Sequence, residues 1–97
     1  MTAVHEMRNT LDRMVALLRL GEPSTFPRSL EQAVSRLESD LPYSVHRILS
    51  LYGGMGSLND VVLYRGNQLL VEENNEFDVL RSKLYDLCLK VRAETEG

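Results

Sequence analysis

Only one of the 97 residues is a cysteine, Cys88, so the chain can form neither an internal disulfide nor a cysteine-rich zinc site. It also lacks an apolar run of the about eighteen residues that a membrane span requires. Charged residues interrupt the first twenty positions, where a secretory signal would need an unbroken apolar stretch. These absences predict a cytoplasmic protein that does not contact a membrane.

Runs of basic residues are absent as well. The chain has 11 lysines and arginines against 14 aspartates and glutamates, which gives a net charge of −3. Non-specific nucleic-acid binding depends on neutralising phosphates with these basic side chains. We therefore expect no nucleic-acid partner, and a protein with a basic surface is the better expectation.

The length predicts one domain, 1–97, because the chain is too short for a second hydrophobic core. Hydrophobic residues make up 43% of the sequence and charged residues 26%, as in ordinary globular proteins. We therefore expect a folded chain rather than a disordered one.

Three stretches in the first half carry apolar residues at the three- and four-residue steps of an amphipathic helix. The first covers residues 4–20, and its apolar stripe is wide enough to contact more than one neighbour. The second follows Pro27 and is expected to end at residues 39–42. The third is expected to begin with Ser44 as its N-cap, and the chain should leave it at Gly53 in a left-handed conformation.

The clearest helix is the last one, whose apolar stripe runs through residues 77–91. Asn75 precedes the stripe and Asp78 follows three residues later, a spacing that resembles a capping box. Acidic residues crowd the start and basic residues come later, which complements the helix dipole. Cys88 falls on the stripe, where a small thiol packs as a hydrophobic residue.

Two β-prone runs, residues 61–64 and 68–71, flank the sequence Arg65-Gly66-Asn67, which suits a tight hairpin turn. A lone hairpin is marginal in water, so it must pack on the helices or join a partner's sheet. The predicted fold is mainly α (α+β): a compact bundle of about four helices, with a short β-hairpin between the third and the C-terminal helix. The alternative is an all-helical domain in which residues 61–71 are irregular.

The stretch YGGMGSLNDVVLY, residues 52–64, raises the question of a phosphate-binding loop. Such loops place backbone N–H groups at a helix N-terminus, usually with a lysine nearby. Here the glycines follow a helix and no lysine is close, so we expect a bend in which Ser57, Asn59 and Asp60 satisfy the backbone of the turn. Met55 either contacts a partner or fills a gap in the core.

Catalytic patterns are weak. The trio His46, Ser57 and Asp60 lacks the fixed spacing of a nucleophile elbow. Asp60 and the glutamates at 72, 73 and 76 could supply oxygen ligands, but their spacing matches no calcium loop. The sequence therefore predicts no catalytic residue, no metal and no cofactor.

Four carboxylates occur without a base in residues 72–78, and Asp60 is expected to lie across the base of the hairpin from them. A negative patch of this kind speeds the encounter with a positive partner and sharpens the choice of partner. The residues predicted to bind the partner are Met55, Ser57, Asn59, Asp60, Glu72, Glu73 and Glu76.

The stretch YGGMGSLNDVVLY, followed by EENNEFDVLRSKLYDLC, resembles a small uncharacterised bacterial family. Its members share a Gly-Met-Gly-Ser-x-Asn-Asp stretch after a helix, then a short apolar run and a terminal helix, so the resemblance covers residues 44–91. That family is similar in size, acidity and lack of catalytic groups to the immunity proteins of bacterial toxin systems. The resemblance implies a toxin inhibitor and assigns no functional residues.

The leading expectation is therefore a non-enzymatic binding protein, an immunity protein that covers the active site of a cognate toxin with a basic cleft. The alternative is a homo-oligomeric adaptor or structural module, such as a homodimer formed through the hairpin edge or the stripe of the first helix. A small metal-dependent enzyme that uses His46 or the carboxylates is a third reading.

Overall fold

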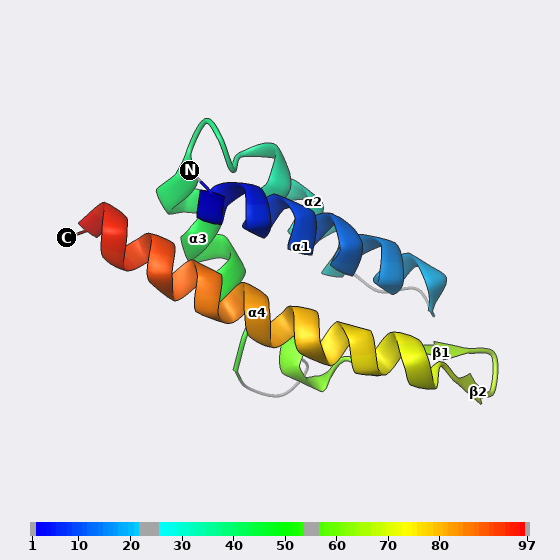
Figure 1. Cartoon of the computed structure of the whole chain (residues 1–97). Coiled ribbons are helices and arrows are strands. Elements are labelled where there is room, and N and C mark those ends of the chain that lie inside the picture. The colour runs from blue at the N-terminus through cyan, green and yellow to red at the C-terminus, as the bar shows by residue number, and fades with distance from the viewer. Residues whose placement is uncertain (1, 22–25, 54–56, 97) are drawn as a thin grey trace.

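The computed structural model describes residues 2–21, 26–53 and 57–96 (Figure 1). The elements, in chain order, are helices α1 (Thr2–Leu20), α2 (Phe26–Ser35) and α3 (Leu41–Leu49), a short 3-10 helix η1 (Leu58–Asp60), strands β1 (Tyr64–Arg65) and β2 (Gln68–Leu69), and helix α4 (Val71–Glu96). The predicted fold class is confirmed, and the all-helical alternative is wrong, because β1 and β2 form an antiparallel hairpin between α3 and α4.

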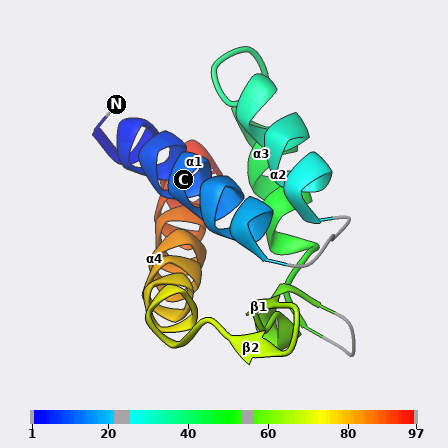
Figure 2. The ribbon, with the colours of Figure 1, turned by 90° about the vertical axis from the view of Figure 1, so that its right-hand side faces the viewer.

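The two long helices, α1 and α4, lie antiparallel and in contact along their lengths (Figure 1). Helix α2 packs on α1, and α3 packs on both α2 and α4, which closes the bundle. Figure 2 looks along α4 and shows the hairpin beside the start of this helix, at one end of the molecule. The bundle is elongated, with extents of 46 × 22 × 21 Å.

The core follows the predicted apolar stripes. Fully buried side chains of α1 meet those of α4, and α2, α3 and η1 complete the core; the largest of these side chains are Phe77, Met7, Leu11, Met14, Leu17, Leu18, Leu30, Leu37, Ile48, Leu58, Leu84 and Val91. Because α1 buries both Met14 and Leu17, it contacts α2 as well as α4, as its wide stripe predicts. Leu20, at its end, is 45% exposed.

The predicted boundary between the second and third helices is wrong. Helix α2 ends at Ser35, and Asp40 rather than Ser44 caps α3: its carboxylate accepts a hydrogen bond from the Tyr43 N–H at 3.3 Å. Ser44 lies inside α3, is fully buried and donates its hydroxyl to the carbonyl oxygen of Ala33 at 2.8 Å. Ser44 therefore ties α3 to α2, and Asp40, two residues before Pro42, caps α3.

The predicted start of the last helix is also wrong, by about one turn. Helix α4 begins at Val71, so Asn75 is an exposed residue within the helix and not its cap. Glu72 and Glu73 lie in the first turn of α4, so their negative charges interact favourably with the helix dipole there.

The hairpin is real but shorter than predicted, with two residues in each strand. Tyr64 pairs with Leu69, and Arg65 pairs with Gln68. Gly66 has a φ of +64°, the left-handed conformation that a two-residue hairpin turn requires and that glycine adopts at little cost.

Candidate binding surface

The hairpin is fixed to the start of α4 by the side chain of Asn74. Its Oδ1 accepts the Leu63 N–H at 2.8 Å, and its Nδ2 donates to the Leu63 carbonyl at 2.9 Å and to the Leu70 carbonyl at 2.7 Å. The amide thus pairs with both backbone groups of Leu63, as a neighbouring strand would. A two-stranded hairpin is only marginally stable by itself, and here the Asn74 side chain of α4 provides additional hydrogen bonds to it.

The inner face of the hairpin is anchored in the core. Leu63 is 3% exposed and Leu70 is half-buried, and the Leu70 N–H donates to the Leu63 carbonyl at 3.0 Å. The end of α1 approaches closely: a Cβ at Gly21 would lie 3.3 Å from Leu63 Cδ2 and 3.4 Å from the Tyr64 carbonyl oxygen. Two helices and the core therefore hold the hairpin in one orientation.

The outer face of the hairpin carries four exposed apolar side chains. Because successive residues of an extended chain point to opposite faces, Val62 and Tyr64 point away from the buried Leu63. Tyr64 lies opposite Leu69 in the strand pairing, and Val71, two residues after Leu69, is the first residue of α4. The four side chains, 43–58% exposed, are called the hairpin surface below: Val62, Tyr64, Leu69 and Val71.

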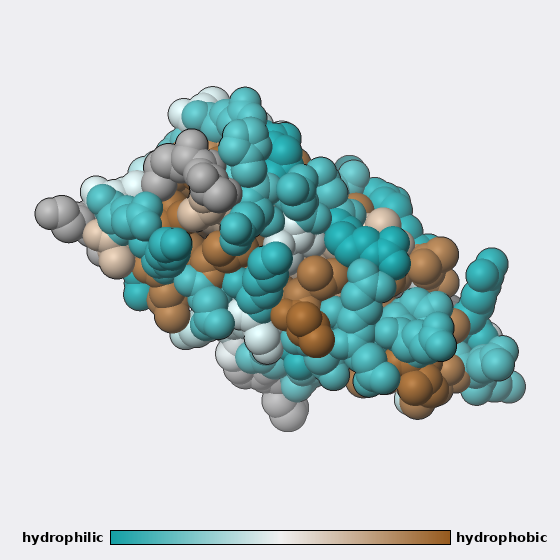
Figure 3. All heavy atoms as spheres, in the orientation of Figure 1, coloured by the Kyte–Doolittle hydropathy of each residue, from teal (hydrophilic) through white to brown (hydrophobic). Residues whose placement is uncertain are grey.

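Hydrophobic side chains also show among hydrophilic ones at the hairpin end in the space-filling view (Figure 3). Single exposed apolar residues are common on proteins, whereas a group of them is typical of an interaction site. A hairpin held rigidly by Asn74 is well suited to presenting such a group. The sequence suggested the hairpin edge for self-association, but none of these four side chains was predicted as a binding residue.

Two of the predicted carboxylates lie beside the hairpin surface. Glu72 is exposed and Glu73 is half-buried, and both directly follow Val71 in the first turn of α4. Glu76 has another role: Arg13 of α1 donates two hydrogen bonds to its carboxylate, at 2.5 and 2.9 Å. These hydrogen bonds lower the pKa of the Glu76 carboxyl below its ordinary value. Glu76 therefore links α1 to α4, while Glu72 and Glu73 form no ion pair in the described parts of the chain.

The glycine-rich bend follows α3, and its backbone role is as predicted where it is described. Gly53 has a φ of +85°, and the Ser57 hydroxyl accepts the Asn59 N–H at 3.2 Å. Ser57 is only 8% exposed, so it shapes the turn from within. Met55, a predicted contact residue, lies outside the described residues, as do its two glycine neighbours.

Asn59 and Asp60 are exposed on η1, which precedes the hairpin. The guanidinium of Arg81 donates to the Asn59 carbonyl at 3.3 Å. Arg81 lies nine residues after Glu72, which is about 14 Å along the helix axis at 1.5 Å per residue. The predicted binding residues are thus spread along α4 rather than gathered at one point.

A groove with a volume of about 520 Å³ lies between the end of α3 and α4. Tyr52 and Tyr85 line it as an edge-to-face pair, 5.1 Å between ring centres. The Tyr52 hydroxyl donates to the Arg81 carbonyl at 2.7 Å, and burial raises the pKa of this phenol. Tyr52 thereby connects the end of α3 to α4, so this lining residue of the groove has a structural role.

Two of the residues considered for catalysis, His46 and Ser57, differ in their surroundings. His46 is exposed on α3, whereas the Ser57 hydroxyl is buried in its own turn. The described side chains contain no group of three or more histidine, cysteine, aspartate or glutamate residues placed to hold a metal ion. Cys88 is buried in the core as predicted, and burial raises the pKa of its thiol to about 12. None of the described helices is long and apolar enough to cross a membrane.

Comparison with known proteins identified a family. The family model of a domain of unknown function, DUF6966, matches residues 22–71, just over half of the chain. The matched segment includes α2, α3, the glycine-rich bend and the hairpin, and it ends at the first residue of α4. No curated protein and no solved structure matched the chain.

Proposed function

The chain belongs to the DUF6966 family, and we propose that it is a non-enzymatic binding protein that covers a basic functional surface of a partner protein. The most concrete form of this proposal is a cytoplasmic immunity protein that blocks the active site of a cognate bacterial toxin. Inhibition would be steric, because a rigid projection that fills a cleft excludes the substrate without any chemistry of its own.

The hairpin surface is the observation that carries the proposal. Protein interfaces combine an apolar centre, from which charged residues are depleted, with a polar rim. Here Tyr64 and Leu69 form the centre, and Glu72 and Glu73 lie at the rim. A standard complex buries about 800 Å² on each partner, and the hairpin with the adjacent turn of α4 forms one end of this small domain (Figure 1).

The two carboxylates define the charge of the partner. Neither lies within ion-pair distance of a basic side chain in the described chain, although Arg13 attracts Glu73 at longer range, so both can contact lysines or arginines on another molecule. Charges at the rim of an interface act mainly on the rate of association and on partner choice. We therefore expect a basic partner whose association with this protein becomes slower as salt is added.

Co-expression with the toxin candidate encoded beside this protein tests the proposal. Val62→Asp and Leu69→Asp each place a charge within the hairpin surface and should abolish co-purification of the pair. Val79→Asp is the matched control, because Val79 is a 67% exposed valine on α4, outside the hairpin surface. A complex that survives both hairpin substitutions would disprove the role assigned to the hairpin surface.

A homodimer through the hairpin is the second candidate. Each strand of this two-stranded sheet has a neighbour on one side only, so its other edge can pair with a strand of a second copy. Light scattering on the purified protein separates the two candidates. A stable dimer that Leu69→Asp converts to a monomer would favour self-association, whereas a monomer that binds its partner favours the inhibitor.

A further inference from the structure

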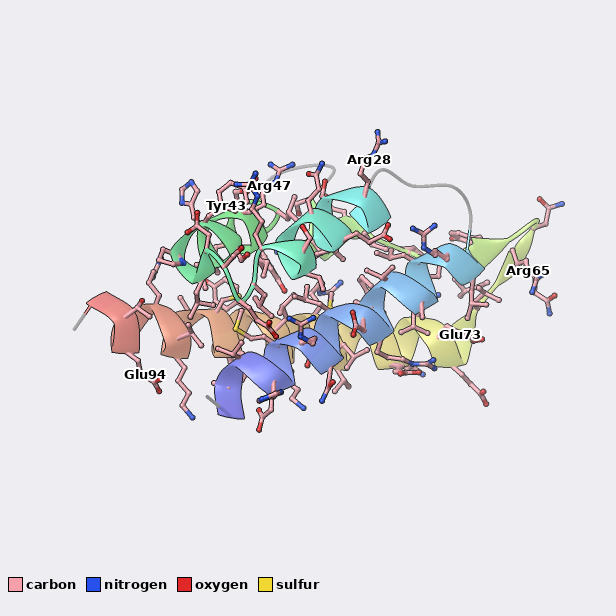
Figure 4. The ribbon with its side chains drawn as sticks, turned by 90° about the horizontal axis from the view of Figure 1, so that it is seen from above. Arg28, Tyr43, Arg47, Arg65, Glu73 and Glu94 are labelled. Atoms are coloured by element: carbon pink, nitrogen blue, oxygen red, sulfur yellow. The ribbon has the colours of Figure 1, made fainter. Side chains whose placement is uncertain are left out.

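A second surface, on α2 and α3, carries basic side chains that the proposed function does not use. Arg28 lies in α2, Arg36 follows the end of that helix, and Arg47 lies in α3. Figure 4 shows Arg28, Tyr43 and Arg47 extending from the α2–α3 side of the molecule, while Glu73 and Glu94 belong to α4. The charges of this overall acidic chain are therefore unevenly distributed.

The acidic residues of the same segment are already engaged elsewhere. Glu31 pairs with Arg19 of α1, and Glu38 pairs with Arg8 of α1 at 2.8 Å. The Asp40 carboxylate caps α3. All three carboxylates between residues 26 and 50 thus serve the fold. Arg28, Arg36 and Arg47 are left without a carboxylate within ion-pair distance in the described chain.

The geometry around Tyr43 brings two of these arginines together. The Arg36 guanidinium lies over the Tyr43 ring, 4.7 Å from its centre, an arrangement that holds the cation in place and leaves its N–H edge free. Arg47 is four residues after Tyr43 in α3, so the two side chains are neighbours on one helix face.

Arg47 supplies a separate observation. Its Nε is buried and has no hydrogen-bond acceptor among the described residues. Buried donors in native proteins are nearly always satisfied, and an unsatisfied one calls for an explanation such as an absent ligand. A partner carboxylate that contacts the guanidinium of Arg47 would form a charge-assisted hydrogen bond with it.

We propose that this arginine row, Arg28, Arg36, Tyr43 and Arg47, binds the carboxylates of an acidic segment of a partner protein. The segment lies across α2 and α3, with one carboxylate at Arg47 and another at Arg36. A nucleic acid is the less suitable occupant, because its binding depends on many phosphate contacts and the row contains only three arginines. The site lies apart from the hairpin surface and binds a partner of the opposite charge.

The test uses the full-length protein labelled with ¹⁵N and a fluorescent octaglutamate peptide as the probe. Titration at low salt should shift the Arg47 Nε–H resonance, and the affinity measured by anisotropy should fall about tenfold in Arg47→Gln, the loss of one charge-assisted hydrogen bond. Arg36→Gln should have a similar effect. Lys83→Gln and Lys90→Gln remove one positive charge each from exposed positions of α4 and are the matched controls.

Equal losses of affinity in the arginine and lysine variants would overturn the proposal, because they would show a response to net charge alone. An Arg47 resonance that does not move with the peptide would overturn it too, and this measurement needs no variant to fold. Tighter binding of an oligothymidylate of equal charge would assign the row to nucleic acid instead. None of these outcomes depends on the hairpin surface, so the site and the proposed function can fail separately.

Discussion

Replacing Asn74 with alanine should detach the hairpin from α4 while leaving the helical bundle intact. The substitution removes three hydrogen bonds, of 2.7, 2.8 and 2.9 Å, from a partly buried position. The Leu63 and Leu70 carbonyls keep one backbone donor each, from the N–H groups of Leu70 and residue 74. The Leu63 N–H, in contrast, loses the partner that the structure gives it.

The magnitude follows from that count. A typical hydrogen bond contributes about 1 kcal/mol net, and a buried group left without a partner costs about 1–3 kcal/mol. The two carbonyls each keep one hydrogen bond from a backbone N–H, so most of the lost free energy comes from the unpaired Leu63 N–H. We expect Asn74→Ala to lower the free energy of unfolding by about 2–3 kcal/mol, a large share of the roughly 5–15 kcal/mol available to a domain.

Urea denaturation followed by circular dichroism measures this loss, and amide exchange locates it. The protection of the Leu63 and Leu70 amides should fall more than that of the core helices, because the hairpin opens first. Asn75→Ala is the matched control, since Asn75 is the next residue in the same helix and is exposed. Equal effects of the two substitutions would refute the role assigned to the Asn74 side chain.

Three further predictions concern the bundle. Ser44→Ala removes the buried hydroxyl bonded to the Ala33 carbonyl at 2.8 Å and should lower the free energy of unfolding by about 1 kcal/mol in urea, whereas an unchanged midpoint would contradict the tie between α2 and α3. Because Arg13 lowers the pKa of Glu76, the pair stabilises the fold above the ordinary carboxyl pKa of 4.5, and this contribution is lost as the pH falls through the lower folded value. The difference in urea midpoint between wild type and Glu76→Gln should therefore be larger at neutral pH than in acid. An equal difference at both pH values would contradict a stabilising contribution of the ionised Glu76. The Cys88 thiol, whose pKa is raised to about 12, should react with a disulfide reagent at pH 8 only after unfolding in urea, and rapid labelling of the native protein would show that it is accessible.

The helices were predictable because their apolar residues recur at the three- and four-residue spacing of a helix. Met7, Leu11 and Met14 recur at helical spacing and are fully buried, and so are Leu84 and Val91 of the last stripe. The hairpin turn was predictable from Gly66, because few other residues adopt its left-handed conformation.

The helix boundaries were not predictable from the same patterns. Asp40 and Ser44 are both residue types that commonly cap helices. Asp40 is the cap of α3 because the Ser44 hydroxyl is hydrogen-bonded to the Ala33 carbonyl instead. Asn75 looked like a cap, but its neighbour Asn74 bonds to a backbone eleven residues away. Such long-range contacts override local capping preferences.

The candidate site could be predicted only in part. Glu72 and Glu73 were identified from charge alone, and they do lie at the exposed start of α4. The Glu76 carboxylate looked equivalent in sequence, but Arg13, sixty-three residues away, engages it. The direction in which Tyr64 and Leu69 point depends on the strand register. The sequence does not define this register, because polar and apolar residues do not alternate along these short strands.

The most direct test of the central claim is site-specific photo-crosslinking in the producing cell. A photoreactive phenylalanine at Leu69, in the hairpin surface, should give a covalent adduct with one basic protein, and the same residue at the exposed Val79 should not. Adducts that are identical at the two positions, or no adduct at Leu69, would contradict the claim that the hairpin surface is where this protein binds its partner.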